Sequence, residues 1–158
     1  MRIQVVMTLP REALSVPVIR HTVATALGTA GVTPECVGEV EVALSEACIN
    51  VFRHAAQGAS YDVVISIGDE QLTMDVVDSG AGFGDLGAPP PATAEQDAER
   101  DRGIALMRAL SDRAVFDTVT GGGRSVHLMK HLRWTDPGVD ERPAAGAVWN
   151  GAPDPPVV

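Results

Sequence analysis

The chain has 158 residues, of which 45% are hydrophobic and 21% are charged, and its formal net charge at pH 7 is -9. This length and hydrophobic content favour one folded domain and leave no room for a second large catalytic module. An acidic chain repels phosphate backbones, so the charge argues against direct nucleic-acid binding.

The first elements are predicted from alternation and from turn residues. Residues 2–9 alternate polar and apolar side chains, which predicts a strand that ends at Pro10. Ser15 begins a helical pattern whose apolar stripe continues to Gly28 or Gly31. The apolar run at the N-terminus is too short for a secretory signal, and no run approaches a membrane span, so we expect a cytoplasmic protein.

The second helix has the clearest sequence pattern. Thr33 can cap it, and Pro34 occupies the first helical position. Apolar residues recur every three or four positions and predict a buried face that continues to about Ala56. These residues are Val37, Val40, Leu44, Ala47, Val51 and Ala55.

The two cysteines of the chain, Cys36 and Cys48, fall within this predicted second helix. Their spacing corresponds to about 18 Å along a helix. A disulfide cannot span that distance. We therefore expect two small buried side chains in a reducing compartment and no metal or redox role.

Two hairpins follow in the second half of the chain. Residues 61–67 and 72–77 are rich in residues that favour strands and are joined by a short polar turn. Residues 114–119 and 124–132 form a similar pair around three consecutive glycines. Both pairs predict antiparallel strands.

A long segment rich in glycine and proline separates the two hairpins. Residues 78–102 include three consecutive prolines and are predicted to be a loop, which at such a length is usually functional or disordered. Residues 103–110 then predict a short helix. We expect a folded domain over residues 1–134 and a disordered tail over residues 135–158, which are rich in Pro, Gly, Asp and Ala.

This order of elements predicts an α+β fold. The predicted elements are a strand, two helices, two strands, a loop, a helix and two strands. Their order implies a two-layer α/β sandwich, with a mostly antiparallel sheet and the helices on one face.

Three separated segments carry residues with chemical potential. Glu46 and Asn50 are four positions apart on the second helix and therefore share a face. Asp78 is followed by glycines at alternate positions, and Gly103 stands where a helix is expected to begin, so that free N–H groups attract phosphate. Taken separately, such features are more often a solvated helix face, a turn and a flexible helix entry than parts of a functional site.

Together, the segments resemble a known family. The chain resembles the histidine-kinase-like ATPases in the order of their nucleotide-binding boxes. It has the run SEACIN, then a hairpin, DSGAGF, a Pro/Gly-rich lid and RGIALM. The resemblance is strongest to the anti-sigma-factor serine/threonine kinases of the RsbW and SpoIIAB type, and it extends over about residues 2–132. It implies the Bergerat ATPase fold, with ATP and Mg²⁺ as cofactors.

The resemblance implies roles for five of these residues. Asn50 matches the metal-binding asparagine of the family, and its amide oxygen is a hard ligand of the kind magnesium prefers. Glu46 matches the catalytic base, which accepts the proton of the attacking hydroxyl. Asp78 matches the acid that accepts a hydrogen bond from the adenine amino group. Gly80 and Gly82 let the backbone approach the base and ribose closely.

Further positions match the boxes after the lid. Gly103 matches the first glycine after the lid, and Arg102 is placed where a cation could neutralise charge on the transferred group, although lid arginines are more often solvated or partner-facing. Ser125 falls where the family has a threonine that bridges Asp78 and the base, with a plain strand serine as the alternative. Ala105 departs from the family, many of whose members have a second glycine there.

The resemblance also implies a function. We expect an anti-sigma factor that phosphorylates Ser or Thr on an anti-sigma factor antagonist of the STAS type and that sequesters a sigma factor. The alternative is a non-catalytic module that binds the sigma factor or the antagonist with weak or no kinase activity. The resemblance further suggests a homodimer formed through the first strand and helix, with no membrane partner.

Overall fold

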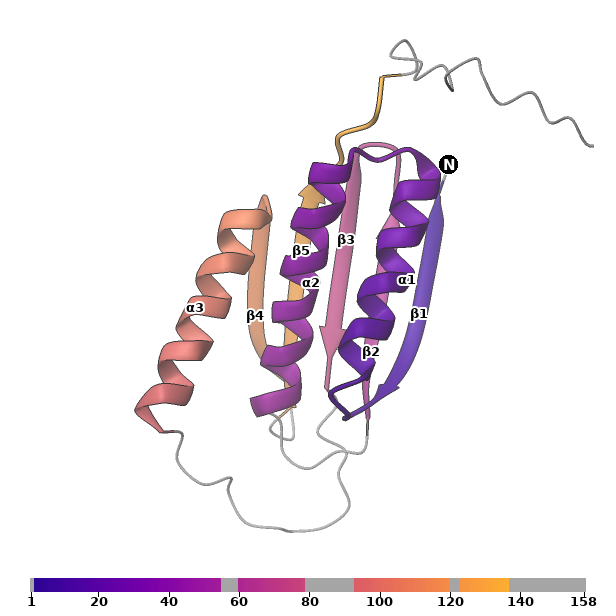
Figure 1. Cartoon of the computed structure of the whole chain (residues 1–158). Coiled ribbons are helices and arrows are strands. Elements are labelled where there is room, and N and C mark those ends of the chain that lie inside the picture. Colours follow the sequence, from indigo (N-terminus) through magenta and orange to yellow (C-terminus); the bar gives the residue numbers. More distant parts are fainter. Residues whose placement is uncertain (1, 55–59, 79–92, 120–122, 137–158) are drawn as a thin grey trace, which may run out of the picture.

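The elements of the chain follow one another in the predicted order (Figure 1). The computed structural model describes residues 2–54, 60–78, 93–119 and 123–136. The elements are β1 (Ile3–Pro10), α1 (Ser15–Ala30), α2 (Pro34–His54), β2 (Ser60–Ile67), β3 (Gln71–Val77), α3 (Ala94–Leu110), β4 (Arg113–Val119) and β5 (Gly123–His131).

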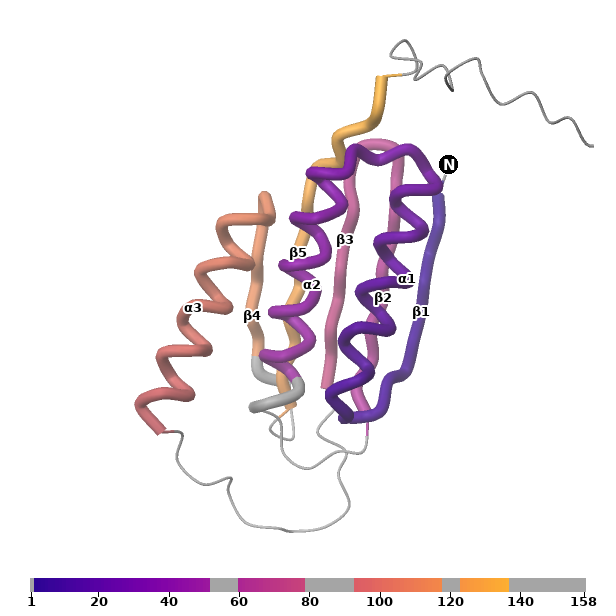
Figure 2. Tube along the Cα trace, viewed as in Figure 1, coloured from indigo at the N-terminus to yellow at the C-terminus, as the bar shows by residue number. Residues whose placement is uncertain are grey.

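The strands form one sheet in the order β1-β2-β3-β5-β4, and every neighbouring pair is antiparallel. Figures 1 and 2 show the three helices of the described chain side by side on one face of this sheet. The predicted two-layer α+β sandwich is therefore confirmed.

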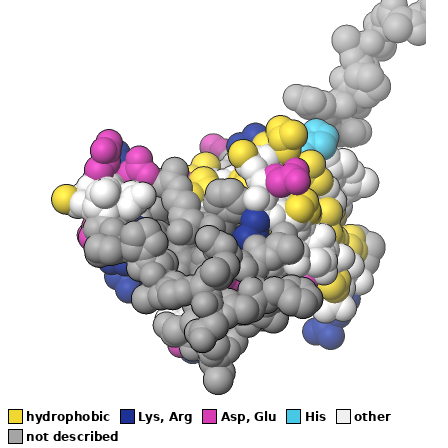
Figure 3. Space-filling model, turned by 90° about the horizontal axis from the view of Figure 1, so that it is seen from below, with side chains coloured by type: hydrophobic (Ala, Val, Ile, Leu, Met, Phe, Trp, Pro, Cys, Tyr) yellow, Lys and Arg dark blue, Asp and Glu magenta, His cyan; other side chains and the backbone are white. Residues whose placement is uncertain are grey.

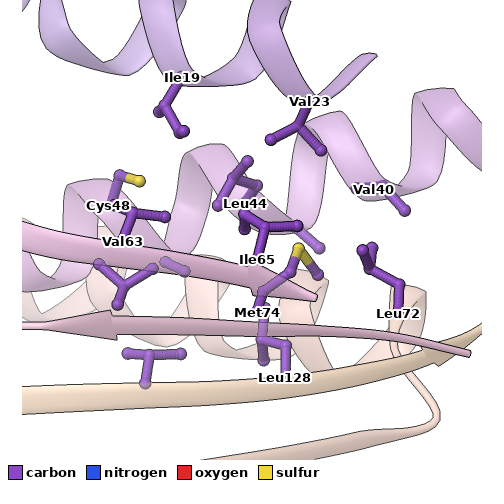
Figure 4. Close-up of a cluster of buried hydrophobic side chains, with 14 of the residues drawn as sticks. Ile19, Val23, Val40, Leu44, Cys48, Val63, Ile65, Leu72, Met74 and Leu128 are labelled. Atoms are coloured by element: carbon purple, nitrogen blue, oxygen red, sulfur yellow. The ribbon is translucent and has the colours of Figure 1, made fainter. Parts of the chain in front are cut away.

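The core lies between the two layers (Figure 4). Ile19 of α1 and Leu44 of α2 are fully buried over Ile65 of β2, Met74 of β3 and Leu128 of β5. Alternation along the strands turns every second side chain toward the helices. Full burial of a side chain such as Leu44 contributes about 1.5–3 kcal/mol. The predicted apolar stripe of α2 forms part of this core, with Val40, Ala47 and Val51 also buried.

The start of α2 differs from the prediction. The Thr33 hydroxyl is buried and has no hydrogen-bond partner among the described residues, so it does not cap the helix. Main-chain bonding begins the helix instead, because the Thr33 carbonyl accepts the Val37 N–H at 3.0 Å. The end of α1 agrees with the prediction, since Gly31 follows it with a left-handed φ of 93°.

Helix α3 begins nine residues earlier than predicted, at Ala94 instead of Gly103. A capping box explains the difference: the Thr93 hydroxyl accepts the Gln96 N–H, and the Gln96 side chain accepts the Thr93 N–H. Acidic residues in the first turn, Glu95 and Asp97, add a favourable interaction with the helix dipole. The predicted loop therefore ends at residue 93, and residues 79–92 lie outside the described chain.

The end of the described chain is tied to the fold. Trp134 pairs with Val32 in an isolated antiparallel bridge, and its Nε1 donates to the Asp69 carbonyl at 2.8 Å. The Thr135 N–H and hydroxyl both donate to the Gly31 carbonyl at 2.8 Å. Thr135, predicted as the first residue of the tail, thus still contacts the domain, and residues 137–158 lie outside the described ranges.

Both cysteines are buried and free, as their spacing predicted. Burial raises the pKa of the Cys48 thiol to about 12, which disfavours the reactive thiolate. No helix of the described ranges combines the length and the apolar character that a membrane crossing requires.

Candidate functional site

Helix α2, which carries Glu46 and Asn50, and strand β3, which precedes Asp78, end at the same end of the molecule. The C-terminal end of α2, the end of β3 and the start of α1 all lie at the lower end of Figure 1. Figure 3 views this end directly and shows both acidic and basic side chains on its described surface. Gly80 and Gly82, predicted to approach the base, lie outside the described residues.

A pocket lies between α2 and α3. Its volume is about 250 Å³, and its wall is formed by Glu46, Ile49, Glu99, Arg102, Gly103 and Leu106. Two predicted site residues from α3, Arg102 and Gly103, thus meet Glu46 of α2. Asn50, one helical turn beyond Glu46, is 8% exposed. The pocket therefore brings a cation, Arg102, together with two carboxylates, Glu46 and Glu99.

Gly103 permits the close approach of α2 to α3. A Cβ added there would lie 2.7 Å from Glu46 Oε2, which is closer than carbon and oxygen atoms pack. Gly103 is the tenth residue of α3. Within a helix its N–H is used in the main-chain ladder, so it is not the free phosphate-facing donor that the sequence predicted for a helix start. Its role in this structure is to make room for the Glu46 carboxylate.

Two arginines of α3, Arg100 and Arg102, occupy different environments. Arg100 forms ion pairs on the surface of α3, with Asp97 at 3.7 Å and Asp101 at 4.0 Å. Arg102 lines the pocket. Of the two, Arg102 is therefore the arginine that shares the pocket wall with Glu46.

Asp78 follows β3 directly and is 1% exposed. Its N–H donates to the Arg124 carbonyl at 2.9 Å, which continues the pairing of β3 with β5. Its carboxylate forms an ion pair with Arg11, which lies between β1 and α1 and whose side chain is 12% exposed. Removing one partner of a buried ion pair typically costs about 3–5 kcal/mol. A single hydrogen bond to a charged group contributes less, about 1.5–3 kcal/mol.

Sequence reasoning missed Arg11. Pairing of β1 with β2 and of β2 with β3 brings the end of β1 to the end of β3. That order of strands depends on long-range pairing, and an isolated arginine after a strand carries no local pattern to reveal it. The sequence shows only that Arg11 directly follows Pro10, where the predicted strand ends, and this position does not indicate a partner.

Hydrogen bonds fix the segment that carries Arg11. The Ser15 hydroxyl bonds to the Tyr61 hydroxyl at 2.8 Å and donates to the Glu12 carbonyl at 2.8 Å. Burial raises the pKa of Tyr61 to about 12, so this hydroxyl stays protonated near neutral pH. The start of α1 is thereby attached to β2 next to Arg11.

The strand register separates Ser125 from Asp78, contrary to the prediction. Ser125 pairs with Val77, and directly opposed residues of an antiparallel pair share a face of the sheet. Val76 and Val126 form the adjacent opposed pair, and both are buried toward the helices. Ser125 therefore lies on the face away from the helices, whereas Asp78 continues the buried face.

Comparison with known proteins identifies the family. A family model described as the histidine kinase-like ATPase domain matches residues 9–130. The chain belongs to this family. As an ATPase domain of this family, it is expected to bind ATP, and its five-stranded sheet and helices agree with that assignment.

Curated relatives of this histidine kinase-like ATPase include regulators of sigma factors. The serine-protein kinase RsbW of Bacillus subtilis is 30% identical over 136 residues, which cover 80% of this chain and 84% of the relative. The anti-sigma F factor of Clostridium acetobutylicum is 28% identical over 116 residues, covering 70% and 81%. These similarities support membership of the anti-sigma factor kinase group within the family.

A solved structure supports the fold. The RsbU and RsbW domains of a Mycobacterium tuberculosis protein superpose with a TM-score of 0.62 at 18% identity, covering 85% of this chain and 35% of that one. At this identity the likeness concerns the architecture alone.

The residues of this histidine kinase-like ATPase fit a magnesium nucleotide. Glu46 offers a hard oxygen at the pocket, and Arg102 offers a cation there. Asn50 lies one turn further along α2, outside the pocket wall, and offers a second hard oxygen. Asp78 is not part of the wall of that pocket and is a buried hydrogen-bond acceptor after β3. The pocket with its charged wall and the buried Asp78 carboxylate are thus separate groups.

Proposed function

We propose that this protein is an anti-sigma factor that binds ATP with magnesium and phosphorylates Ser or Thr on an anti-sigma factor antagonist. The observation that carries the proposal is the Glu46 carboxylate in a pocket shared with Arg102, in a chain similar to RsbW. Phosphoryl transfer depends mostly on positioning and electrostatics, which a carboxylate, an amide and an arginine can supply.

Each side chain has a definite task in this proposal. The Glu46 carboxylate accepts the proton of the attacking hydroxyl. The Asn50 amide oxygen would hold the magnesium ion, and Arg102 would neutralise charge on the transferred group. Asp78 accepts a hydrogen bond from the adenine amino group. Bound magnesium ATP supplies the phosphoryl group and part of the charge neutralisation.

The proposed partners are a sigma factor, which the protein sequesters, and an antagonist of the STAS type, which it phosphorylates. The names of the relatives motivate both partners. A net charge of -9 favours association with a basic protein surface, as charge complementarity speeds encounter. We further propose a cytoplasmic homodimer formed through β1 and α1.

A phosphotransfer assay tests the kinase proposal. The protein is incubated with labelled ATP, magnesium and candidate antagonists, and Glu46→Gln is compared with Glu41→Gln. Glu41 is a matched control, because it lies on the same helix in an exposed 3.9 Å ion pair with Arg20. We expect Glu46→Gln to slow transfer by about 10²–10⁴-fold and Glu41→Gln to retain it. Full transfer by Glu46→Gln would refute the assigned mechanism.

A second candidate is a non-catalytic module that binds the sigma factor or the antagonist. Two observations favour it: Gly103 lies inside α3 instead of at its start, and Ala105 stands where many relatives have glycine. Binding of either partner by the wild-type protein, without transfer to any antagonist tested, would select this function over the kinase.

A further inference from the structure

The ion pair between Arg11 and Asp78 has no part in the function proposed so far. We infer that Arg11 is a positioning residue of the nucleotide site: it holds the Asp78 carboxylate in the orientation that selects adenine over guanine. The inference rests on the proposed function, in which Asp78 reads the base.

The pair is built into the fold. Asp78 is 1% exposed and the Arg11 side chain is 12% exposed, so both groups are largely removed from water. The segment of Arg11 is held on one side by the end of β1 and on the other by the bonds of Ser15 to Tyr61 and Glu12. The guanidinium therefore meets Asp78 from a fixed direction.

Arg11 remains on Asp78 when a base enters. Breaking a buried ion pair costs more than one hydrogen bond from a neutral amino group returns. A carboxylate can accept about four hydrogen bonds, and a guanidinium carries five N–H donors. An amino group can therefore join the pair without displacing the arginine.

Orientation of the carboxylate gives selectivity. At the same ring position adenine presents an amino donor, whereas guanine presents a carbonyl acceptor. A carboxylate held toward that position accepts from adenine and repels the guanine carbonyl. A carboxylate released from Arg11 can turn toward the N–H donors on the neighbouring edge of guanine, so the preference for adenine falls.

The test measures binding of magnesium ATP and magnesium GTP by calorimetry. Wild type is compared with Arg11→Ala and Arg11→Lys, and with Arg20→Ala as a control, since the Arg20 side chain is 47% exposed in a surface ion pair. We expect Arg11→Ala to weaken ATP binding by about tenfold, equivalent to about 1.4 kcal/mol, and to lower the ATP-to-GTP affinity ratio. Compared with Arg11→Ala, Arg11→Lys should recover part of the affinity for ATP and part of the ATP-to-GTP ratio, because lysine keeps the charge but not the planar fork of the guanidinium. Arg20→Ala leaves both unchanged.

The outcomes separate this inference from the proposed function. Absence of ATP binding in the wild type overturns the proposed function itself. If the wild type binds ATP and Arg11→Ala has an unaltered ATP-to-GTP affinity ratio, only the role of Arg11 is overturned. Tighter ATP binding by Arg11→Ala overturns that role as well, because it would mean that Arg11 competes with the base. Circular dichroism checks folding, and if Arg11→Ala does not fold, the ratio in Arg11→Lys and Arg11→Gln decides.

Discussion

At Gly103, one absent methyl group determines how closely the Glu46 carboxylate approaches α3. In Gly103→Ala the added Cβ would lie 2.7 Å from Oε2, so the carboxylate must move. Because Oε2 ends a flexible side chain, we expect folding to tolerate the change, with a gain of up to about 1 kcal/mol from helix propensity. Phosphotransfer should fall, because the displaced carboxylate no longer meets the attacking hydroxyl.

The matched control for this variant is Gly38→Ala. Gly38 also lies within a helix, α2, and an added Cβ there meets no atom within 4 Å. Thermal unfolding should show a similar gain in stability for the control, and labelled-ATP assays should show unchanged transfer. Equal transfer by both variants would mean that the contact between Glu46 and Gly103 has no part in catalysis.

The sequence predicted the local pairs of the site and missed those made over long range. Glu46 and Asn50 share a face because the helical period alone fixes their relation. Ser125 was misplaced because a strand register decides which face a residue occupies, and a shift of one residue reverses the face. Arg11 was missed because its partner is 67 residues away.

Among the elements, α3 depends most on one local motif. Thr93→Ala removes the hydroxyl that accepts the Gln96 N–H, and loss of an N-cap costs about 0.5–2 kcal/mol. We expect the first turns of α3 to open more often, which amide hydrogen exchange over residues 94–102 would detect as faster exchange. Thr93→Ser keeps the cap and should retain the protection. Unchanged exchange in Thr93→Ala would mean that packing alone holds this part of the helix.

The same helix shows where sequence reasoning about elements failed. The prolines before residue 93 and the glycines of the preceding segment led to a loop prediction that ran on to residue 102. The capping box at Thr93 and Gln96 was present in the sequence but weaker than the glycine and proline signal. Elsewhere the bounds of the predicted strands and helices agree with the structure to within about two residues. The exception is the predicted end of the second helix, because Ala55 and Ala56 lie outside the described residues.

For the whole molecule, the layers could be predicted and the strand order could not. Helical stripes and paired strands were sufficient for a two-layer sandwich. Placing β3 between β2 and β5 requires pairing across the segment that contains α3, for which the sequence offers no local signal. That placement positions Asp78, the residue that we propose reads the base.

Lys130 links three elements across the molecule. Its Nζ lies 2.7 Å from Glu39 Oε2 of α2 and donates to the Leu110 carbonyl at the end of α3, while Lys130 itself belongs to β5 and its side chain is 8% exposed. The hydrogen bond from Lys130, supported by Arg133, lowers the pKa of Glu39 below its ordinary value of 4.5. A lowered folded-state pKa means that the stabilisation is complete above pH 4.5 and is lost as the pH falls through the folded-state pKa.

Glu39→Gln should therefore destabilise the protein in a pH-dependent way. It leaves the buried Lys130 ammonium without its carboxylate, and we expect a loss of about 1–3 kcal/mol near pH 7 in denaturant unfolding. The difference in the free energy of unfolding between Glu39→Gln and the wild type should shrink as the pH falls below 4.5, because protonation of Glu39 then removes the same charge from the wild type. Glu41→Gln, which removes an exposed carboxylate of the same helix with a 3.9 Å partner, should cost less. If this difference in the free energy of unfolding stays constant with pH, Glu39 stabilises the assembly of α2, α3 and β5 by packing instead of by charge.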